Sequence, residues 1–300
     1  MKKLNFLTLV TMWVGILVDQ PLSAEVQKSY FSDKKKSQES DKSQHHFLNP
    51  TPHHLMREMA TDRPDKTESP YTVDAGHYQI EVSFLDYTYD KNNPDKTDTK
   101  VETFKITPIN FKAGLCNNVD FQFVMEPHIS ERTKADGEIQ RKNGFGDIQT
   151  RLKINMWGSD GGSTALAIMP FVKFPTNQSN LGNDALEGGL IIPFAVKLPH
   201  DWDMGFMTEF DAKEDSASND YHAEFINTIT VGHEIIGDLN GYIEFFSSVS
   251  SEVKSKWIGT VDTGLTYAIT NNIQLDMGVN IGITKSANDF NPFLGLSMRY

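Results

Sequence analysis

Polar and apolar residues alternate without a break from Asp147 to Met156, and similar stretches recur from about residue 78 to Tyr300. Successive side chains of a β-strand point to opposite faces, so a period of two predicts strands. The polar face of residues 147–156 carries Arg151 and Lys153 beside Gln149 and Asn155. Strands that combine an apolar face with so charged a face are typical of a barrel with lipid outside and water inside.

Twelve segments share this pattern, and bacterial outer-membrane barrels have an even number of strands. We expect strands at residues 78–90, 101–112, 119–130, 147–157, 163–174, 186–198, 202–213, 221–235, 239–249, 257–269, 273–283 and 292–300. The predicted fold class is therefore all-β, a closed antiparallel transmembrane β-barrel of about 12 strands. Pro108, Pro127, Pro170 and Pro193 lie in or near these strands and predict bulges or kinks, because proline cannot donate a ladder hydrogen bond.

The connections between the predicted strands alternate in length. Longer, polar connections fall at 91–100, 131–146, 175–185, 214–220, 250–256 and 284–291, and short turns fall at 113–118, 158–162, 199–201, 236–238 and 270–272. Outer-membrane barrels have long extracellular loops and short periplasmic turns. This alternation predicts that both ends of the barrel lie in the periplasm.

The first 24 residues have the organisation of a secretory signal peptide. Lys2 and Lys3 precede an apolar run from Leu4 to Val18, and small residues end at Ala24, after which we expect cleavage. Residues 25–59 are polar, with Lys34–Lys36 and two pairs of histidines, and we expect a disordered periplasmic tail there. No metal site is expected from those histidines, because nothing in the sequence fixes their geometry.

Composition excludes several classes of protein. After residue 18 no apolar run is long enough for a membrane-spanning helix. The formal charge of −12 excludes a general nucleic-acid binder, which needs a basic face. The single cysteine, Cys116, cannot form an internal disulfide. No phosphate loop, zinc pattern or dinucleotide fingerprint occurs, so we expect no cofactor.

The final predicted strand places Leu294, Leu296, Met298 and the terminal Tyr300 on one face. This arrangement is similar to the terminal strand by which outer-membrane barrels are recognised for assembly. We therefore expect the assembly machinery of the outer membrane, and its lipid, among the partners of this chain.

Charged residues gather at the positions that the period of two directs inward. They are Glu81, Glu126, Arg151, Lys153, Lys173, Glu187, Glu209, Asp211, Glu224, Glu244, Asp262 and Asp276. Charges are costly in lipid, which favours the lumen for all of them. Two interpretations stay open: the charges pair into a polar plug that holds a narrow barrel together, or some of them line a pathway and select what passes. In a pathway, the excess of carboxylates favours cations or neutral solutes over anions.

A barrel enzyme is the rival class. His128 and Ser130 have the spacing found in the outer-membrane phospholipase, but the alternation predicts that both face the lumen, whereas a lipid hydrolase presents its nucleophile to the bilayer. Asp136, Asp220 and His222 could mimic the rim of an omptin-like protease, although solvated loop charges are far commoner. We expect no enzyme activity.

The segment that leads into the barrel carries the sequence Ala60-Thr61-Asp62-Arg63-Pro64-Asp65-Lys66-Thr67-Glu68-Ser69-Pro70. With Val73, Gly76 and 78–81 it resembles the opening of the family called "putative meta-pathway of phenol degradation", and weaker likenesses continue in order to residue 300. The resemblance implies an outer-membrane β-barrel that takes up small, aromatic or hydrophobic compounds, and it carries no catalytic residues. Lys66 departs from the family pattern, where an aromatic residue is commoner.

The charges of Asp62, Arg63, Asp65 and Glu68, with Pro64 among them, also suggest a rigid segment over residues 60–77 that could fold into the barrel as a plug. The sequence thus predicts a channel or transporter in the bacterial outer membrane that passively admits small molecules. A structural or adhesion barrel without transport is the alternative, and a lipid hydrolase comes third.

Overall fold

The computed structural model describes residues 41–91, 99–215, 218 and 220–300. In this part of the chain one 3-10 helix, η1 (His53–Leu55), precedes fifteen strand segments. These are β1 (Tyr78–Lys91), β2 (Lys100–Ile106), β3 (Ile109–Cys116), β4 (Val119–Met125), β5 (His128–Ala135), β6 (Glu138–Gly144), β7 (Ile148–Trp157), β8 (Thr164–Phe174), β9 (Glu187–Lys197), β10 (Trp202–Glu214), β11 (Tyr221–Ile236), β12 (Leu239–Ser250), β13 (Ile258–Thr270), β14 (Ile273–Gly282) and β15 (Phe290–Arg299).

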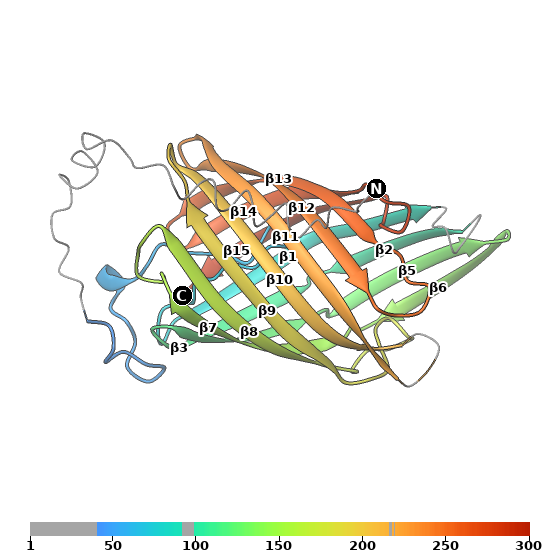
Figure 1. Ribbon diagram of the computed structural model, residues 1–300, viewed down its shortest axis with the longest axis horizontal. Coiled ribbons are helices and arrows are strands. Elements are labelled where there is room, and N and C mark those ends of the chain that lie inside the picture. The colour runs from blue at the N-terminus through green and yellow to red at the C-terminus, as the bar shows by residue number, and fades with distance from the viewer. Residues whose placement is uncertain (1–40, 92–98, 216–217, 219) are drawn as a thin grey trace, which may run out of the picture. The chain divides into compact units, whose positions relative to one another are not determined.

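All strands belong to one antiparallel sheet that closes on itself, because β15 pairs with β1. The first half of β1 pairs with β3 and its second half with β2, so β2 and β3 together form one wall strand. The same is true of β4 with β5 and of β6 with β7. The fifteen segments therefore make a barrel of twelve strands, which confirms the predicted fold class (Figure 1).

The three divided strands are interrupted beside one another. The breaks fall at Thr107–Pro108, at Glu126–Pro127 and at residues 145–147. Pro108 and Pro127 interrupt the ladder as predicted, since each lacks an N–H group. By contrast, Pro170 and Pro193 lie within β8 and β9 without a shift in register, so the bulges expected there are absent.

The predicted long connection at 131–146 is wrong. Most of it forms the β5–β6 hairpin, which continues the barrel wall at the end of the long loops (Figure 1). Asp136 and Gly137 make its two-residue turn with φ of 51° and 83°, and two positive φ angles in succession are what a type I′ hairpin turn requires. The polar composition of the segment reflects its exposed position rather than the absence of strand structure.

Side chains alternate across the wall as the period of two predicts. On β14, Leu275, Met277 and Ile281 are exposed on the outer face, whereas Asp276 is 2 % exposed on the inner face. On β15, Ser297 is fully buried, and Tyr300, one residue beyond the strand, is exposed. Most buried side chains of the described residues are polar or charged, the reverse of a soluble protein, because the interior of the barrel holds them.

Residues 42–59 are ordered, so the predicted tail over 25–59 is too long at its C-terminal end. Arg57 forms a salt bridge of 3.1 Å with the buried Asp74, and Lys42 bonds Asp160 at 2.8 Å. Residues 1–40, which include the predicted signal peptide, lie outside the described residues. No helix in the described part of the chain is long and apolar enough to cross a membrane.

Candidate functional site

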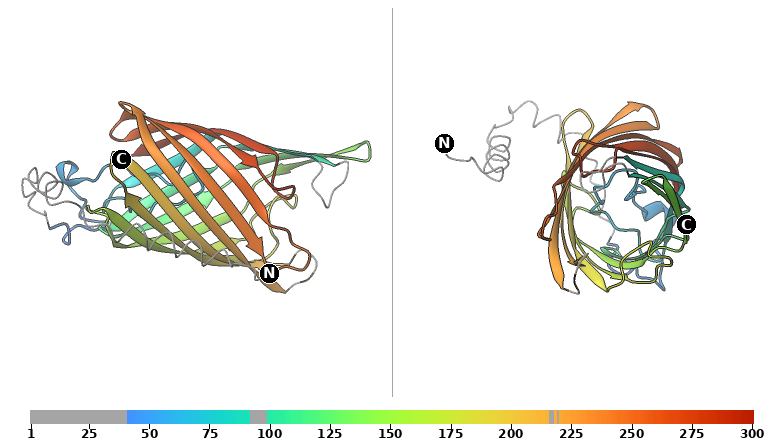
Figure 2. Two further views of the ribbon diagram at one scale, coloured as in Figure 1. Left: turned by 45° about the horizontal axis from the view of Figure 1, so that its top comes forward. Right: turned by 90° about the vertical axis from the view of Figure 1, so that its right-hand side faces the viewer.

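Residues 60–77, which we call the lead-in segment, return into the barrel before β1 begins. Polar side chains of the inner wall bind Asp62, Arg63, Lys66, Thr67 and Glu68. The view along the barrel in Figure 2 shows the N-terminal part of the described chain, drawn in blue, within the ring of strands. A peptide segment inside a barrel needs partners for its charges, and two sides of the wall supply them.

The first side, the basic wall, consists of Lys112 on β3 and of Arg151 and Lys153 on β7. Lys112 Nζ lies 2.5 Å from a carboxylate oxygen of Asp62, and Lys153 Nζ lies 2.6 Å from the other oxygen. The side chains of Lys112, Lys153 and Asp62 are almost fully buried. Burial acts to raise the pKa of Asp62, but the charges and hydrogen bonds of the two lysines lower it below its ordinary value.

Two further contacts complete this side. The Asp62 N–H donates to both carboxylate oxygens of Glu81, at 3.1 and 3.2 Å. Arg151 pairs with Glu68 through a contact of 2.5 Å. Burial raises the pKa of Glu68 even though the Arg151 charge opposes the shift.

The second side, the acidic wall, consists of Glu244 on β12, Asp262 on β13 and Asp276 on β14. Arg63 donates to both oxygens of Asp276, at 2.7 and 3.2 Å, and Lys66 Nζ lies 3.0 Å from Asp262. The Arg63 guanidinium packs so closely on Gly295 that a Cβ atom there would collide with it. In the order of strands β12–β14 lie across the ring from β3 and β7, so the lead-in segment spans the lumen.

Glu244 binds the backbone of the lead-in segment rather than a cation. Its carboxylate accepts the Lys66 N–H at 2.9 Å and the Thr67 N–H at 2.7 Å. It also accepts the Thr67 hydroxyl at 2.5 Å, so one side chain receives three hydrogen bonds. This arrangement fixes the turn of the segment at mid-barrel.

The other predicted lumen residues form their described ion pairs along the wall rather than with the lead-in segment. Lys173 lies 3.3 Å from Glu187 and from Asp147, and Glu224 pairs with Lys213 at 2.8 Å. Glu209 and Asp211 follow on the inner face of β10. Glu126 pairs with Lys105 where the divided strands are interrupted. Half of the twelve predicted residues therefore meet the lead-in segment, namely Glu81, Arg151, Lys153, Glu244, Asp262 and Asp276.

Sequence reasoning missed Lys112, Asp120 and Asp74, and it treated Lys66 only as a departure from a pattern. Lys112 is 2 % exposed, and Asp120 is fully buried and accepts the Val73 N–H at 3.0 Å. The period of two within 109–124 would have placed Lys112 and Asp120 inward. Asp74 follows no such period, because it lies in irregular chain and its partners, Arg57 and Arg299, are distant in sequence.

The interior is less polar than the sequence predicts. Met169 and Phe171 on β8, Ile191 on β9 and Met207 on β10 form a buried apolar cluster on the inner face, with Ile226 of β11 packed against it. The Glu68 N–H points at the Met207 sulfur at 3.4 Å. One side of the lumen is thus apolar where the lead-in segment passes it.

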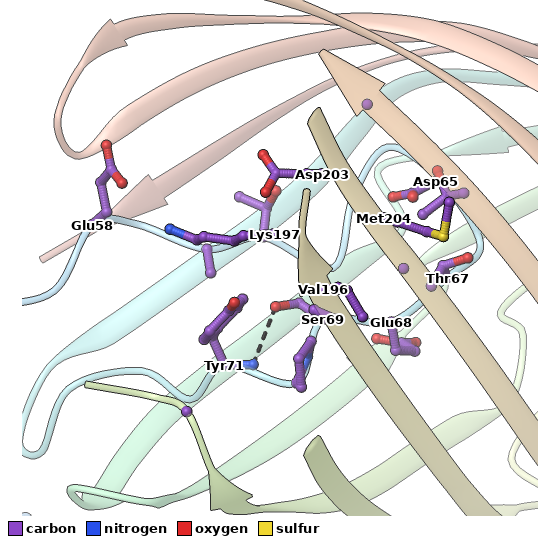
Figure 3. A pocket seen from close by; sticks show the side chains of 18 of the residues that line it. Glu58, Asp65, Thr67, Glu68, Ser69, Tyr71, Val196, Lys197, Asp203 and Met204 are labelled. Atoms are coloured by element: carbon purple, nitrogen blue, oxygen red, sulfur yellow. Dashed lines mark hydrogen bonds between the residues drawn. The ribbon is translucent and has the colours of Figure 1, made fainter. Parts of the chain in front are cut away.

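A cavity of about 630 Å³ lies between the lead-in segment and the wall formed by β9–β13. Its lining includes Asp65 and Tyr71 of the segment and Lys197 and Asp203 of the wall (Figure 3). Tyr242 of β12 also lines it. The short turn at residues 158–162 also contributes, which places the cavity at the end of the barrel with the short turns. Burial raises the pKa of Asp65 to about 7, and the charges of Glu68 and Asp62 add to the rise.

His128 and Ser130 lie on the outer face, which corrects the predicted lumen orientation. The interruption at Pro127 shifts the alternation by one residue, so Ile129 between them is the buried side chain, at 3 % exposure. Across the ladder they pair with Ile106 and with Phe104. The orientation argument against a lipid hydrolase therefore fails, but no hydrogen bond joins His128 to Ser130 in the described part of the chain.

The other enzyme candidates are separated. His222 bonds Asp215 at 2.7 Å rather than Asp220, and Asp136 occupies the turn of a different hairpin. Asp215, His222 and Glu252 place possible ligand atoms within 4.8 Å of one another, the one group of this kind among the described residues. Their side chains lie at the end of the barrel with the long loops, away from the lead-in segment.

The model of one protein family, described as "Putative MetA-pathway of phenol degradation", matches residues 61–300. No curated protein sequence matches the chain. Similar solved structures include the NanC porin, with 11 % identity, coverage of 74 % of this chain and 98 % of that one, and a TM-score of 0.47. The translocator domain of the autotransporter NalP from Neisseria meningitidis has 8 % identity, coverage of 75 % and 88 %, and a TM-score of 0.48. The TodX monoaromatic hydrocarbon channel has 8 % identity, coverage of 74 % and 88 %, and a TM-score of 0.38.

Proposed function

Because the chain belongs to the family described as "Putative MetA-pathway of phenol degradation", we propose that it is an outer-membrane channel that passively admits small molecules, aromatic and hydrophobic ones included. The outer face of the strands is apolar, which suits lipid, and the inner face is charged, which suits a water-filled path. In this proposal the outer-membrane assembly machinery recognises the exposed residues of the C-terminal strand.

The observation that carries the proposal is the lead-in segment held across the lumen by ion pairs on two walls. A barrel of twelve strands is wider than one that its own wall side chains fill, so it has room for an inserted segment and a narrow path. The cavity of about 630 Å³ beside the segment is of the size that binds small organic molecules. The segment then acts as a constriction that limits passage.

The inner surface beside that path combines aromatic side chains with carboxylates. Tyr71 and Tyr242 line the cavity and give a solute apolar contact, while Asp211 and Glu187 lie farther along the same side of the barrel. Rings of carboxylates favour cations over anions in pores. We therefore expect the channel to prefer neutral and cationic solutes.

The test is conductance of the purified protein in planar bilayers, with swelling of liposomes in small solutes as a second readout. Deletion of residues 60–70 removes the ion pairs to both walls, and we expect the single-channel conductance to rise several-fold. Glu138→Gln, an exposed carboxylate on the β5–β6 hairpin, is the matched control and should leave conductance unchanged.

Two outcomes would count against the proposal. If the deletion variant has the conductance of the wild type, the lead-in segment is no constriction. If neither protein conducts or supports swelling although both are folded by circular dichroism, the barrel is a structural or adhesion protein instead.

A further inference from the structure

Most charges that line the cavity beside the lead-in segment already have partners. Arg57 is paired with Asp74, Glu68 with Arg151 and Asp160 with Lys42. At the mouth of the cavity, Lys197 on β9 lies directly opposite Asp203 on β10 in the ladder, so these two exposed charges balance each other.

Asp65 differs from these residues. No lysine, arginine or histidine of the described residues lies within ion-pair distance of its carboxylate, although Arg63 and Lys66 flank it in sequence and both reach the acidic wall instead. Glu58, at the mouth, adds a second carboxylate that forms no ion pair with any described residue. The cavity therefore has an unbalanced negative charge. Of the two carboxylates, Asp65 is the one in the interior.

An aromatic surface accompanies this charge. The ring of Tyr242 lies against the wall where two glycines let it approach: a Cβ atom at Gly264 would be 2.7 Å from its ring, and one at Gly278 would be 3.0 Å from its hydroxyl oxygen. Tyr242 also lines the cavity. Its hydroxyl is buried without a hydrogen-bond partner among the described residues.

Tyr71 adds a second aromatic ring from the lead-in segment, on the side of the cavity opposite the wall (Figure 3). A cavity lined by a carboxylate and two aromatic rings has the groups that recognise organic ammonium ions, since the ring face and the carboxylate both attract positive charge. Pro64 and Pro70 supply further apolar surface from the same segment.

We propose that this cavity is a binding site for small organic cations, with the ammonium group at Asp65 and the apolar part of the ligand between Tyr71 and Tyr242. The proposal rests on the channel function and deepens it, because a solute held here lies beside the constriction. Anions are disfavoured by Asp65 and Glu58, and neutral solutes lack the charge that Asp65 requires.

Three probes that share a phenyl ring and a two-carbon chain separate these classes: 2-phenylethylammonium, 2-phenylethanol and phenylacetate. Isothermal titration calorimetry of the full-length protein in detergent, at pH 8, measures their binding. We expect the cation to bind at least tenfold more tightly than the alcohol and phenylacetate to give no heat. Asp65→Asn should reduce the affinity for the cation at least tenfold and leave the affinity for the alcohol unchanged.

Tyr242→Leu should weaken both the cation and the alcohol, because both use the ring, whereas Glu138→Gln should change neither. Equal affinities for the cation and the alcohol, or cation binding that is unaffected by Asp65→Asn, would overturn the proposal. Channel function is tested separately, by conductance in planar bilayers. If the protein conducts but does not prefer the cation, the binding site is refuted and the channel is not. If it does not conduct, the channel is refuted.

Discussion

Asp62 joins the lead-in segment to four strands of the barrel. Its carboxylate accepts from Lys112 on β3, Lys153 on β7 and, at 3.2 Å, Gln122 on β4, while its N–H donates to Glu81 on β1. Loss of one member of a buried charged group leaves the others uncompensated, at a cost of about 3–5 kcal/mol. A single aspartate can therefore decide whether the segment stays in the lumen.

Asp65 makes the stability of the inserted lead-in segment depend on pH. Its pKa of about 7 in the folded protein lies above the ordinary 3.8, so the inserted segment retains a proton that a released segment loses. The stabilisation is complete below about pH 4 and declines as pH rises to about 7. We expect conductance to increase over this range, by at most about tenfold per pH unit for one proton.

The measurement is single-channel conductance between pH 5 and pH 8. The ionisable groups around Asp65 come from three places. They are Glu68 and Asp62 on the same segment, Tyr242 and Glu244 on β12, and Lys197 with Asp203 at the cavity mouth. Asp65→Asn should flatten most of the pH dependence, leaving the part due to Glu68. An unchanged pH profile in Asp65→Asn would assign the effect to another group.

At the level of elements, the interruption of three neighbouring strands decides which face each side chain of the β5–β6 hairpin takes. Inward positions are even-numbered in β4, where Asp120 and Gln122 are buried, and odd-numbered in β5, where Ile129 is buried. An additional residue in one strand reverses the alternation beyond it. His128 and Ser130 face outward for this reason.

The outward face is the one that a lipid hydrolase would use, yet we expect no catalytic centre on β5. A serine nucleophile needs its base within hydrogen-bond distance, and no such bond joins Ser130 to His128 in the described structure. We expect the purified protein in mixed micelles to release no fatty acid from phospholipid above the rate of a detergent blank. Calcium-independent or calcium-dependent turnover that disappears in Ser130→Ala would contradict this expectation.

For the whole molecule, the barrel exchanges the usual places of polar and apolar side chains. Leu265 on the outer face of β13 is 37 % exposed, whereas its neighbour Thr266 lines the cavity. The wall holds together through its closed ladder of backbone hydrogen bonds, and the interior is held by ion pairs rather than by one apolar core. In the proposed outer-membrane location, the outward face has lipid as its solvent.

Substitutions at two adjacent residues of β13, which lie at nearly the same depth along the barrel, test whether the outer face contacts lipid. Arginine at a lipid-facing position near the membrane centre costs about 2–4 kcal/mol, whereas lumen positions tolerate charge. We expect Leu265→Arg to lower the free energy of unfolding by about that amount and Thr266→Arg by much less. Urea unfolding in lipid vesicles, followed by tryptophan fluorescence, measures both. Equal losses would mean that the outer face is not in lipid.

The sequence by itself determined the closed sheet, the twelve wall strands and the inward direction of residues such as Glu81, Lys153 and Asp276. These properties follow from a local period of two, which each strand carries within its own residues. The family likeness was also readable in 60–70, because consecutive residues carry it.

Only the tertiary structure decided which charges meet. Asp62 and Lys153 are 91 residues apart, and Arg63 and Asp276 are 213 apart, so no local pattern could pair them. The orientation of Ser130 depended on a break in the ladder, and the balance between Lys197 and Asp203 depended on register. Such contacts are set by how the closed wall brings distant strands around one lumen, which is a property of the folded chain and not of any segment of it.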